Sequence, residues 1–369
     1  DRVAKVKGPP GSLSGRLQIW FFGQMQPHHT NWAPVANFLR WLEHRHPQVQ
    51  LMWCPNPPRE LATCGRPPKT EKAQDGTLYT FCPNDKLLAA KCAEAGVQAG
   101  ARMLLVIKGR AKRGAPPAGQ AELGVLKHIR QHNYTRLAIF LTTDELCTFH
   151  SSKVDAAEVI FTQYYHHRLE HVNSSKIYYL PTGISYKFPL ITLAEHIPAS
   201  ARKYVFNLVC SIVTNKVRQK LKNIIETKLK PQLPALPVFE HYVYAWSGNY
   251  DNKSGYVSQQ RFKEVLLDSV FTLMPSGHNP ECYRMYESLE AGSIPVVAME
   301  GLETHCAHPF THFMDAPMVW LDTWDQLPTL MQNYTRDPGK YWAQTAAVTA
   351  WYARFKERIY GTIVQRLVM

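Results

Sequence analysis

Short apolar runs alternate with amphipathic stretches along most of the chain. Runs with the length and composition of buried strands lie at 17–22, 49–53, 103–107, 137–141, 159–164, 177–180, 204–210, 243–246, 270–274, 294–297 and 318–321. Apolar residues with a helical period lie at 32–42, 122–131, 217–228, 259–267, 282–290, 324–332 and from 341 to about 367. Because strands that alternate with helices form parallel sheets, the pattern predicts an α/β protein.

The same pattern divides the chain into parts. Residues 1–15 are basic, rich in Gly and Pro and without periodicity, so a stem or linker is expected there. The pattern predicts one doubly wound domain at residues 16–190 and a second at residues 200–340. A less apolar linker is expected between them. Residues 341–369 predict a C-terminal helix that packs back. In such a pair of domains a ligand is expected in the cleft between the carboxyl ends of the strands.

The composition is that of an ordinary globular protein. The 369 residues are 45% hydrophobic and 19% charged, and 42 Lys and Arg against 29 Asp and Glu give a net charge of +13. This composition disfavours disorder, a coiled coil and a small disulfide scaffold. No apolar run approaches the roughly 20 residues of a membrane helix. The chain begins at Asp1, so we expect an N-terminal signal or anchor to have preceded it.

The positive charge is spread along the sequence and is not gathered in a binding motif. The basic clusters at 108–113 and 216–230 lack the interleaved aromatic residues of a single-strand binder, so nucleic acid is not an expected partner. Solvated faces account for most of this charge. The electrostatic field of this net positive charge would favour an anionic substrate, such as a nucleotide sugar, or an anionic glycan.

Sequons and cysteines indicate a secretory compartment. Asn-x-Ser/Thr sequons occur at Asn133, Asn173, Asn252 and Asn333, where chance predicts about one or two. An even number of cysteines is compatible with disulfides or with free buried thiols, and these residues are Cys54, Cys64, Cys82, Cys92, Cys147, Cys210, Cys282 and Cys306. Their spacing does not suit zinc, and the histidine pairs four residues apart lack the Glu of a His-Glu-x-x-His motif, so no metal site is predicted.

The most informative segment is 269–297, which has the pattern strand, loop, helix, strand. Its loop leads into a helix whose free N–H groups and dipole would bind a diphosphate, and Arg284 in the first turn can reach the same oxygens. Glu287 lies on the same helical face, where its carboxylate can accept both hydroxyls of a ribose. The alternatives are a solvated ion pair between Arg284 and Glu287, and an ordinary helix C-cap at Gly292.

This segment resembles the signature of the exostosin-like glycosyltransferases, and its sequence is most similar to that of their ribitol xylosyltransferase branch. The matching positions are the expected helix at 262–267, Asp268-Ser269-Val270-Phe271, Leu273, Pro275, Gly277, Glu281-Cys282-Tyr283-Arg284, Tyr286-Glu287 and Gly292-Ser293-Ile294-Pro295-Val296-Val297.

Weaker matches extend the resemblance over about residues 17–355. Asp144-Glu145 resembles the family's (Ser/Gly)-(Asp/Asn)-Glu element, and residues 179–183 resemble its Leu-Pro-x-Gly turn. Arg218 resembles the arginine that follows the first strand of the C-terminal domain and meets the donor diphosphate. One departure is plain, because Cys210 stands where the family usually has a Gly that lets the backbone approach the donor.

The resemblance implies a GT-B fold, with a glycan or glycoprotein acceptor on the N-terminal domain and a UDP-sugar donor in the C-terminal domain. It implies inverting transfer, with xylose as the first guess, by a type II membrane protein of the Golgi or endoplasmic reticulum. The residues expected to bind the donor are Arg218, Gly277, Glu281, Arg284, Glu287 and Gly292. No bound cofactor is expected, and no metal, because the sequence has no Asp-x-Asp pattern with which many glycosyltransferases hold a metal diphosphate.

Inverting transfer also needs a base that takes the proton of the acceptor hydroxyl. The candidates follow strands of the N-terminal domain and are Asp144, Glu145, His28 and His29. Acidic residues at a strand end equally cap the next turn, and paired histidines in a polar loop are usually exposed. The alternative function is a catalytically silent subunit or glycan-binding module that acts with a partner chain, in a homo- or hetero-oligomer.

Overall fold

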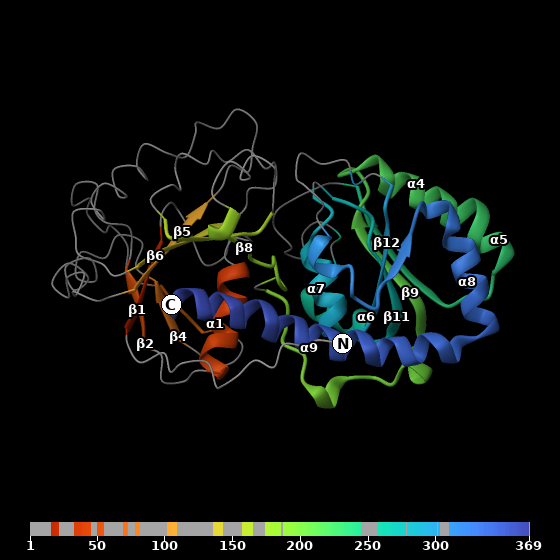
Figure 1. Cartoon of the computed structure of the whole chain (residues 1–369). Coiled ribbons are helices and arrows are strands. Elements are labelled where there is room, and N and C mark those ends of the chain that lie inside the picture. Colours follow the sequence, from red (N-terminus) through yellow and green to blue (C-terminus); the bar gives the residue numbers. More distant parts are fainter. Residues whose placement is uncertain are drawn as a thin grey trace, which may run out of the picture. The chain divides into compact units, whose positions relative to one another are not determined.

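The computed structural model of the chain consists of two compact units (Figure 1). Unit 1 is formed by Asp1–Pro181 and Lys356–Met369, and unit 2 by Thr182–Phe355. The residues that the structure describes are 16–21, 33–45, 50–54, 69–72, 78–81, 102–108, 136–142, 157–164, 174–185, 187–244, 255, 257–277, 279–300, 302 and 310–368.

Unit 1 contains, among its described residues, a six-stranded sheet in the order β2-β1-β5-β6-β7-β8, and every neighbouring pair is parallel. Its strands are β1 (Arg16–Phe21), β2 (Gln50–Cys54), β5 (Arg102–Lys108), β6 (Arg136–Thr142), β7 (Val159–Thr162) and β8 (Ile177–Tyr179). A short antiparallel pair, β3 (Lys69–Lys72) and β4 (Leu78–Phe81), stands apart from this sheet. The expected helix at 122–131 lies outside the described residues.

The end of the long C-terminal helix α9 (Pro338–Val368) completes the core of unit 1. It packs on helix α1 (Ala33–Arg45), where the buried ring of Phe38 lies 5.9 Å from that of Tyr360. On the same side Trp41 Nε1 donates to Glu357 Oε1 at 3.1 Å, and Arg45 Nε donates to the same oxygen at 2.9 Å. The predicted closing helix is therefore confirmed, and its last turns belong to the first unit of the chain.

Unit 2 contains a five-stranded parallel sheet in the order β10-β9-β11-β12-β13 among its described residues. Its strands are β9 (Tyr204–Ser211), β10 (Val238–Val243), β11 (Ser269–Leu273), β12 (Ile294–Ala298) and β13 (Val319–Leu321). Its helices are α4 (Lys216–Ile224), which continues through a π-helical turn (Ile225–Leu229) into α5 (Lys230–Gln232), α6 (Gln259–Leu267), α7 (Tyr283–Glu290), α8 (Leu327–Arg336) and the start of α9.

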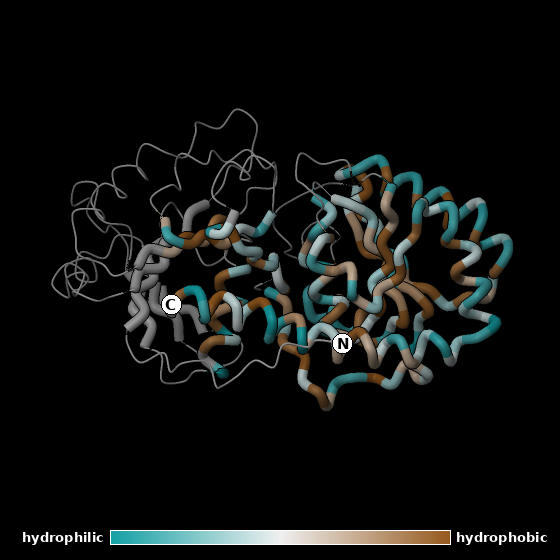
Figure 2. Tube along the Cα trace, in the orientation of Figure 1, coloured by the Kyte–Doolittle hydropathy of each residue, from teal (hydrophilic) through white to brown (hydrophobic). Residues whose placement is uncertain are grey.

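Helices cover both faces of this sheet. Figure 1 shows α6 and α7 on one face and α4 and α8 on the other. Every residue of β11 and β12 is buried, as expected for strands covered on two sides. Figure 2 shows the hydrophobic residues of this unit concentrated along its strands, with hydrophilic residues on the outer helices. Among the described residues, no helix combines the length and the apolar composition that a membrane span requires.

The strand expected at 243–246 lies instead at Val238–Val243, so this prediction was wrong by about five residues. The cause is the position of β10 at the edge of the sheet, where it pairs only with β9 within the described part. Five of its six residues are half-buried. Its sequence has two polar residues, Glu240 and His241, in the middle and therefore lacks the continuous apolar run of a central strand.

The stretch expected to link the two domains, 189–199, is fastened to unit 2. Lys263 of α6, which is 5% exposed, donates from Nζ to the Leu190 carbonyl and to Glu195 Oε1, both at 2.6 Å. Glu195 also accepts hydrogen bonds from the backbone and the hydroxyl of Thr192. A buried ammonium group is stable only with such partners, so these bonds hold the stretch against α6.

The strand order of unit 2 reverses direction at one point in the sheet. From β9 the chain passes through α4 to β10 on one side, and from β11 it passes through α7 to β12 on the other. The direction of travel therefore reverses between the neighbouring strands β9 and β11. In open parallel sheets a crevice forms at such a reversal, outside the carboxyl ends of the strands, and ligands bind there.

Candidate functional site

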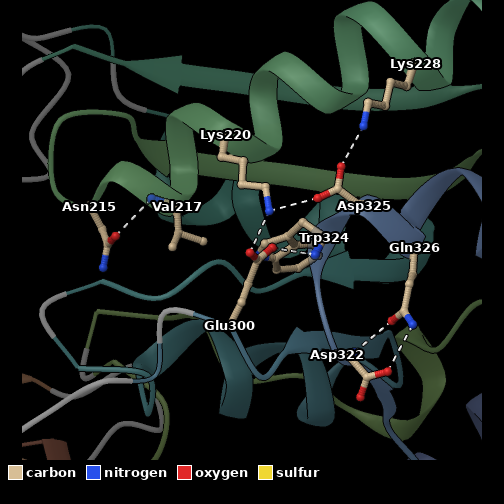
Figure 3. A network of polar contacts seen from close by, with 9 residues as sticks. All are labelled: Asn215, Val217, Lys220, Lys228, Glu300, Asp322, Trp324, Asp325 and Gln326. Carbon is tan, nitrogen blue, oxygen red and sulfur yellow. Dashed lines mark hydrogen bonds and ion pairs between the residues drawn. The ribbon is translucent and has the colours of Figure 1, made fainter.

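The loop between β9 and α4 follows the carboxyl end of β9, on one side of this reversal. Asn215 caps α4, because its side-chain oxygen accepts a hydrogen bond from the Val217 backbone at 3.0 Å (Figure 3). Its Nδ2 donates to the Gly277 carbonyl, also at 3.0 Å, and so joins the loop to the one that follows β11. The first turn of α4 carries Lys216 and Arg218 and no acidic residue. Positive charge there opposes the helix dipole, so the arrangement favours a bound anion.

Arg218 joins the same two loops from inside the protein. Its side chain is 7% exposed, and it donates from Nε to the Ser276 carbonyl at 3.0 Å and from Nη1 to the Ser211 carbonyl at 2.9 Å. A Cβ atom at Gly277 would lie 2.9 Å from Nη2 of this guanidinium. The predicted Gly277 is therefore explained by packing, since a side chain at this position would displace Arg218.

The loop between β11 and α7 follows the carboxyl end of β11, on the other side of the reversal. Within it the Asn279 side chain accepts a hydrogen bond from the Glu281 backbone at 3.0 Å, and α7 starts after Cys282 without a side-chain cap. The first turn of α7 again holds an arginine, Arg284, and no acidic residue. Its Nη1 is buried and has no hydrogen-bond partner in the part of the chain that the structure describes. The expected helix start and its arginine are thus confirmed as structural features.

Two further hydroxyl groups lie at the end of β9 and in the loop that follows it. Ser211 Oγ, at the end of β9, and Thr214 Oγ1, just before the cap of α4, are buried without a partner among the described residues. Serine and threonine are common in loops, so no pattern in the sequence distinguishes these two residues. Only their burial without a hydrogen bond distinguishes them.

Glu281 is buried and bonded to other residues of unit 2. Its side chain is 2% exposed, and its Oε1 accepts hydrogen bonds from the Thr182 backbone at 3.1 Å and the Thr182 hydroxyl at 2.9 Å. The hydroxyl of Tyr286 donates to the same oxygen. Glu281 therefore anchors the first residue of unit 2 to the start of α7, and a contact with the donor stays a prediction.

Glu287, one turn beyond Arg284, is 4% exposed and also holds this entry segment. Its Oε1 accepts a hydrogen bond from the Ser185 backbone at 3.2 Å. Burial raises the pKa of Glu287 to about 7, although the Ser185 N–H and the charge of Arg284 act in the opposite direction. The carboxyl group is therefore not a solvated member of a surface ion pair, and its expected ribose contact stays a prediction.

We predict that the protein loses stability between about pH 4.5 and pH 7 because of Glu287. In the unfolded chain the Glu287 carboxyl group has the ordinary pKa of 4.5, whereas in the folded chain its pKa is about 7. Between these values the folded state binds more protons, so stability falls as the pH rises, by up to about 3 kcal/mol. Urea unfolding at pH 5 and pH 8 measures the effect. Glu287→Gln should lack this fall, and an equal fall in both proteins would contradict the assignment.

An ion-pair network holds α4 on the outer side of the site (Figure 3). Lys220, two residues after Arg218, donates to Glu300 Oε2 at 2.6 Å and lies 2.8 Å from Asp325 Oδ2. Asp325 also accepts from Lys228 at 2.7 Å, and Glu300 accepts from the Trp324 backbone at 2.6 Å. These groups are partly exposed, so each pair adds little stability, but together they fix α4 against the loop after β12.

Gly292 and Cys210 are explained by the local packing. Gly292 follows Ala291, the C-cap of α7, and has a φ of 65°, the left-handed conformation with which a glycine commonly ends a helix. Cys210, in β9, is 3% exposed, and burial raises the pKa of its thiol against the lowering effect of Arg284 and Arg218. Cys210 and Cys282 are free thiols. The expected disulfides stay a prediction for the other cysteines.

The expected catalytic residues Asp144, Glu145, His28 and His29 lie outside the described residues. Their role therefore stays a prediction. Within the described residues, no group of three or more His, Cys, Asp or Glu side chains is placed to hold a metal ion.

Known structures of similar fold cover almost the whole chain. The trehalose-6-phosphate synthase OtsA superposes with a TM-score of 0.57 at 10% identity, over 96% of this chain and 99% of that chain. An alpha,alpha-trehalose-phosphate synthase (UDP-forming) from Burkholderia vietnamiensis gives 0.52 at 8% identity, over 95% and 96%. With the two parallel sheets, these similarities confirm the predicted α/β fold of GT-B type.

Sequence comparison identifies closer relatives. Residues 185–368 match the family model of the RXYLT1 C-terminal domain. Ribitol-5-phosphate xylosyltransferase 1 of Homo sapiens is 27% identical over 248 residues, which are 63% of this chain and 54% of that protein. The Mus musculus protein of the same name is 25% identical over 275 residues, 70% and 60% of the two chains. The chain thus spans little more than half the length of these proteins, and it is a relative of the ribitol xylosyltransferase branch.

Proposed function

We propose that this chain is an inverting glycosyltransferase that moves a sugar from a UDP-sugar to a hydroxyl group of a glycan or glycoprotein. Xylose is the first candidate for the sugar, and a ribitol-5-phosphate unit is the first candidate for the acceptor, because the relatives are named for both. The observation that carries the proposal is the buried Nη1 of Arg284, which has no partner among the described residues and lies at the start of α7.

The site suits the leaving group of such a reaction. Departure of the nucleoside diphosphate places negative charge on its phosphates, and Arg218, Arg284, the dipole of α4 and the free N–H groups at the start of α7 would stabilise it. A guanidinium group offers forked donors to phosphate oxygens. Two arginines and two helix ends supply the charge that a metal ion supplies elsewhere, so we propose transfer without a metal. Glu287 is proposed to contact the ribose.

The remaining parts of the reaction are assigned to unit 1. An acceptor hydroxyl must lose its proton as it attacks the anomeric carbon, and Asp144, Glu145 and His29 are the proposed bases. The four sequons support a lumenal protein of the Golgi or endoplasmic reticulum, and a type II membrane anchor is part of this proposal.

Thermal-shift and transfer assays with a panel of UDP- and GDP-sugars, with and without chelator, test the proposal. We expect a UDP-sugar to raise the melting temperature and to be consumed when a ribitol-5-phosphate acceptor is present, with no effect of the chelator. Arg284→Ala should remove the shift. A protein that responds to no nucleotide would contradict the proposal and would favour the catalytically silent subunit or glycan-binding module.

A further inference from the structure

Three buried polar groups without partners lie on the connections that follow β9 and β11 in unit 2. They are Ser211 Oγ, Thr214 Oγ1 and Arg284 Nη1, and none of them has a hydrogen-bond partner among the described residues. Ser211 is 9% exposed, and its own carbonyl receives the Nη1 bond of Arg218. A buried polar group without a partner costs about 1–3 kcal/mol, so three of them at one place call for a ligand.

The direction of the Ser211 side chain follows from the strand pairing. Cys210 stands opposite Tyr242 in the parallel ladder, and Lys222 of α4 lies 5.4 Å from the Tyr242 ring, so both residues face α4. Successive residues of a strand point to opposite faces. Ser211 therefore faces the side of the sheet that carries α7, the helix of Arg284 (Figure 1).

The chemistry of these groups restricts the ligand. A guanidinium group can only donate hydrogen bonds, and both hydroxyls can donate. The start of α7 has no side-chain cap and so adds free backbone N–H groups, and neither α4 nor α7 carries an acidic side chain in its first turn. A ligand at this place must therefore present several acceptor oxygens and negative charge, as a diphosphate does.

We propose that Ser211 and Thr214 bind the phosphates of the nucleotide donor together with Arg284, and that these hydroxyls make the site selective for a nucleoside diphosphate over the free nucleoside. This inference rests on the proposed function, because it concerns the same donor. It assigns the selectivity to two residues of the β9–α4 loop in addition to the arginines.

The test is a calorimetric titration of the chain and its Ser211→Ala and Thr214→Val variants with UDP, UMP and uridine. Each substitution is expected to weaken the binding of UDP by about 5- to 50-fold, because it removes a hydrogen bond to a charged phosphate. The affinity for uridine should not change, since uridine has no phosphate. The melting temperature of the unliganded variants should equal or exceed that of the parent, since each change removes a buried hydroxyl without a partner. Thr335→Val is the control.

The Thr335 hydroxyl bonds only to a carbonyl of its own helix, among the contacts described, and its loss should not change any affinity. If the parent binds UDP and the variants bind it equally tightly, the inference is overturned and the proposed function is not. An equal loss of affinity for UDP and for uridine would also overturn the inference. A loss of affinity that accompanies a lower melting temperature would do the same. A parent that binds no UDP would overturn the proposed function and this inference with it.

Discussion

Replacing Arg218 with Met is expected to weaken UDP binding by about 100-fold, the equivalent of two charge-assisted hydrogen bonds. Arg218 supplies positive charge at the start of α4, and its bonds to the Ser211 and Ser276 carbonyls hold the two loops of the crevice in place. Met retains most of the apolar stem, but it leaves the Ser211 and Ser276 carbonyls without their donor, so a loss of stability accompanies the loss of affinity. Titration calorimetry and thermal unfolding measure the two effects separately.

Lys220→Met is the matched control for this prediction. It removes one positive charge from the same helix, two residues away, but on the outer side, where Lys220 contacts Glu300 and Asp325. We expect at most a few-fold change in affinity, because exposed ion pairs contribute little. An equal loss of affinity in the two variants would attribute the effect to net charge and would contradict the role of Arg218 in the site.

Replacing Gly292 with Ala is expected to lower the free energy of unfolding by about 2–4 kcal/mol. Its φ of 65° is strained for any residue with a Cβ atom. The added methyl group would also lie 2.6 Å from Thr349 Oγ1 and 3.3 Å from Arg202 Nη2. Arg202 binds the carbonyls of Ala291 and Gly292 at the end of α7 and that of Ser269 in β11, so the displacement would reach the core.

Two further variants separate the causes of this loss in chemical unfolding experiments. Thr349→Ala, added to Gly292→Ala, should restore part of the stability by removing the close contact, and the part caused by the positive φ should remain. Gly361→Ala is the control, because it lies in α9 and the added Cβ would meet no atom within 4 Å apart from its chain neighbours and the backbone of its own helix. It should leave stability unchanged or raise it by up to about 1 kcal/mol. Similar losses at Gly292 and Gly361 would contradict this account.

The elements of unit 2 that position the site could be predicted from the sequence with good accuracy. The segment 269–297 has strong local signals, namely two continuous apolar runs, a helical period between them and Gly292 at the helix end. The structure has β11 at Ser269–Leu273, α7 at Tyr283–Glu290 and β12 at Ile294–Ala298. Central strands of a parallel sheet are buried on both faces, so their sequence is distinctive. The edge strand β10 lacks that property and was misplaced.

The partners of the site residues could not be predicted, because they are distant in the sequence. Glu281 bonds to Thr182, 99 residues away, and Glu287 to Ser185, 102 residues away. No local pattern announces such pairs, and the resemblance to a family indicated only that both carboxylates matter. Ser211 and Thr214 were missed for a related reason, since burial without a hydrogen bond is a property of the folded chain.

Crystallographic localisation of UDP in the chain tests the central claim most directly. We predict that its phosphates lie outside the carboxyl ends of β9 and β11, within hydrogen-bond distance of Arg284 and of the backbone at the start of α7. Arg284 Nη1 should then have the partner that it lacks among the described residues. Electron density for UDP at any other place in the protein, with Arg284 still unpaired, would contradict the assignment of the site.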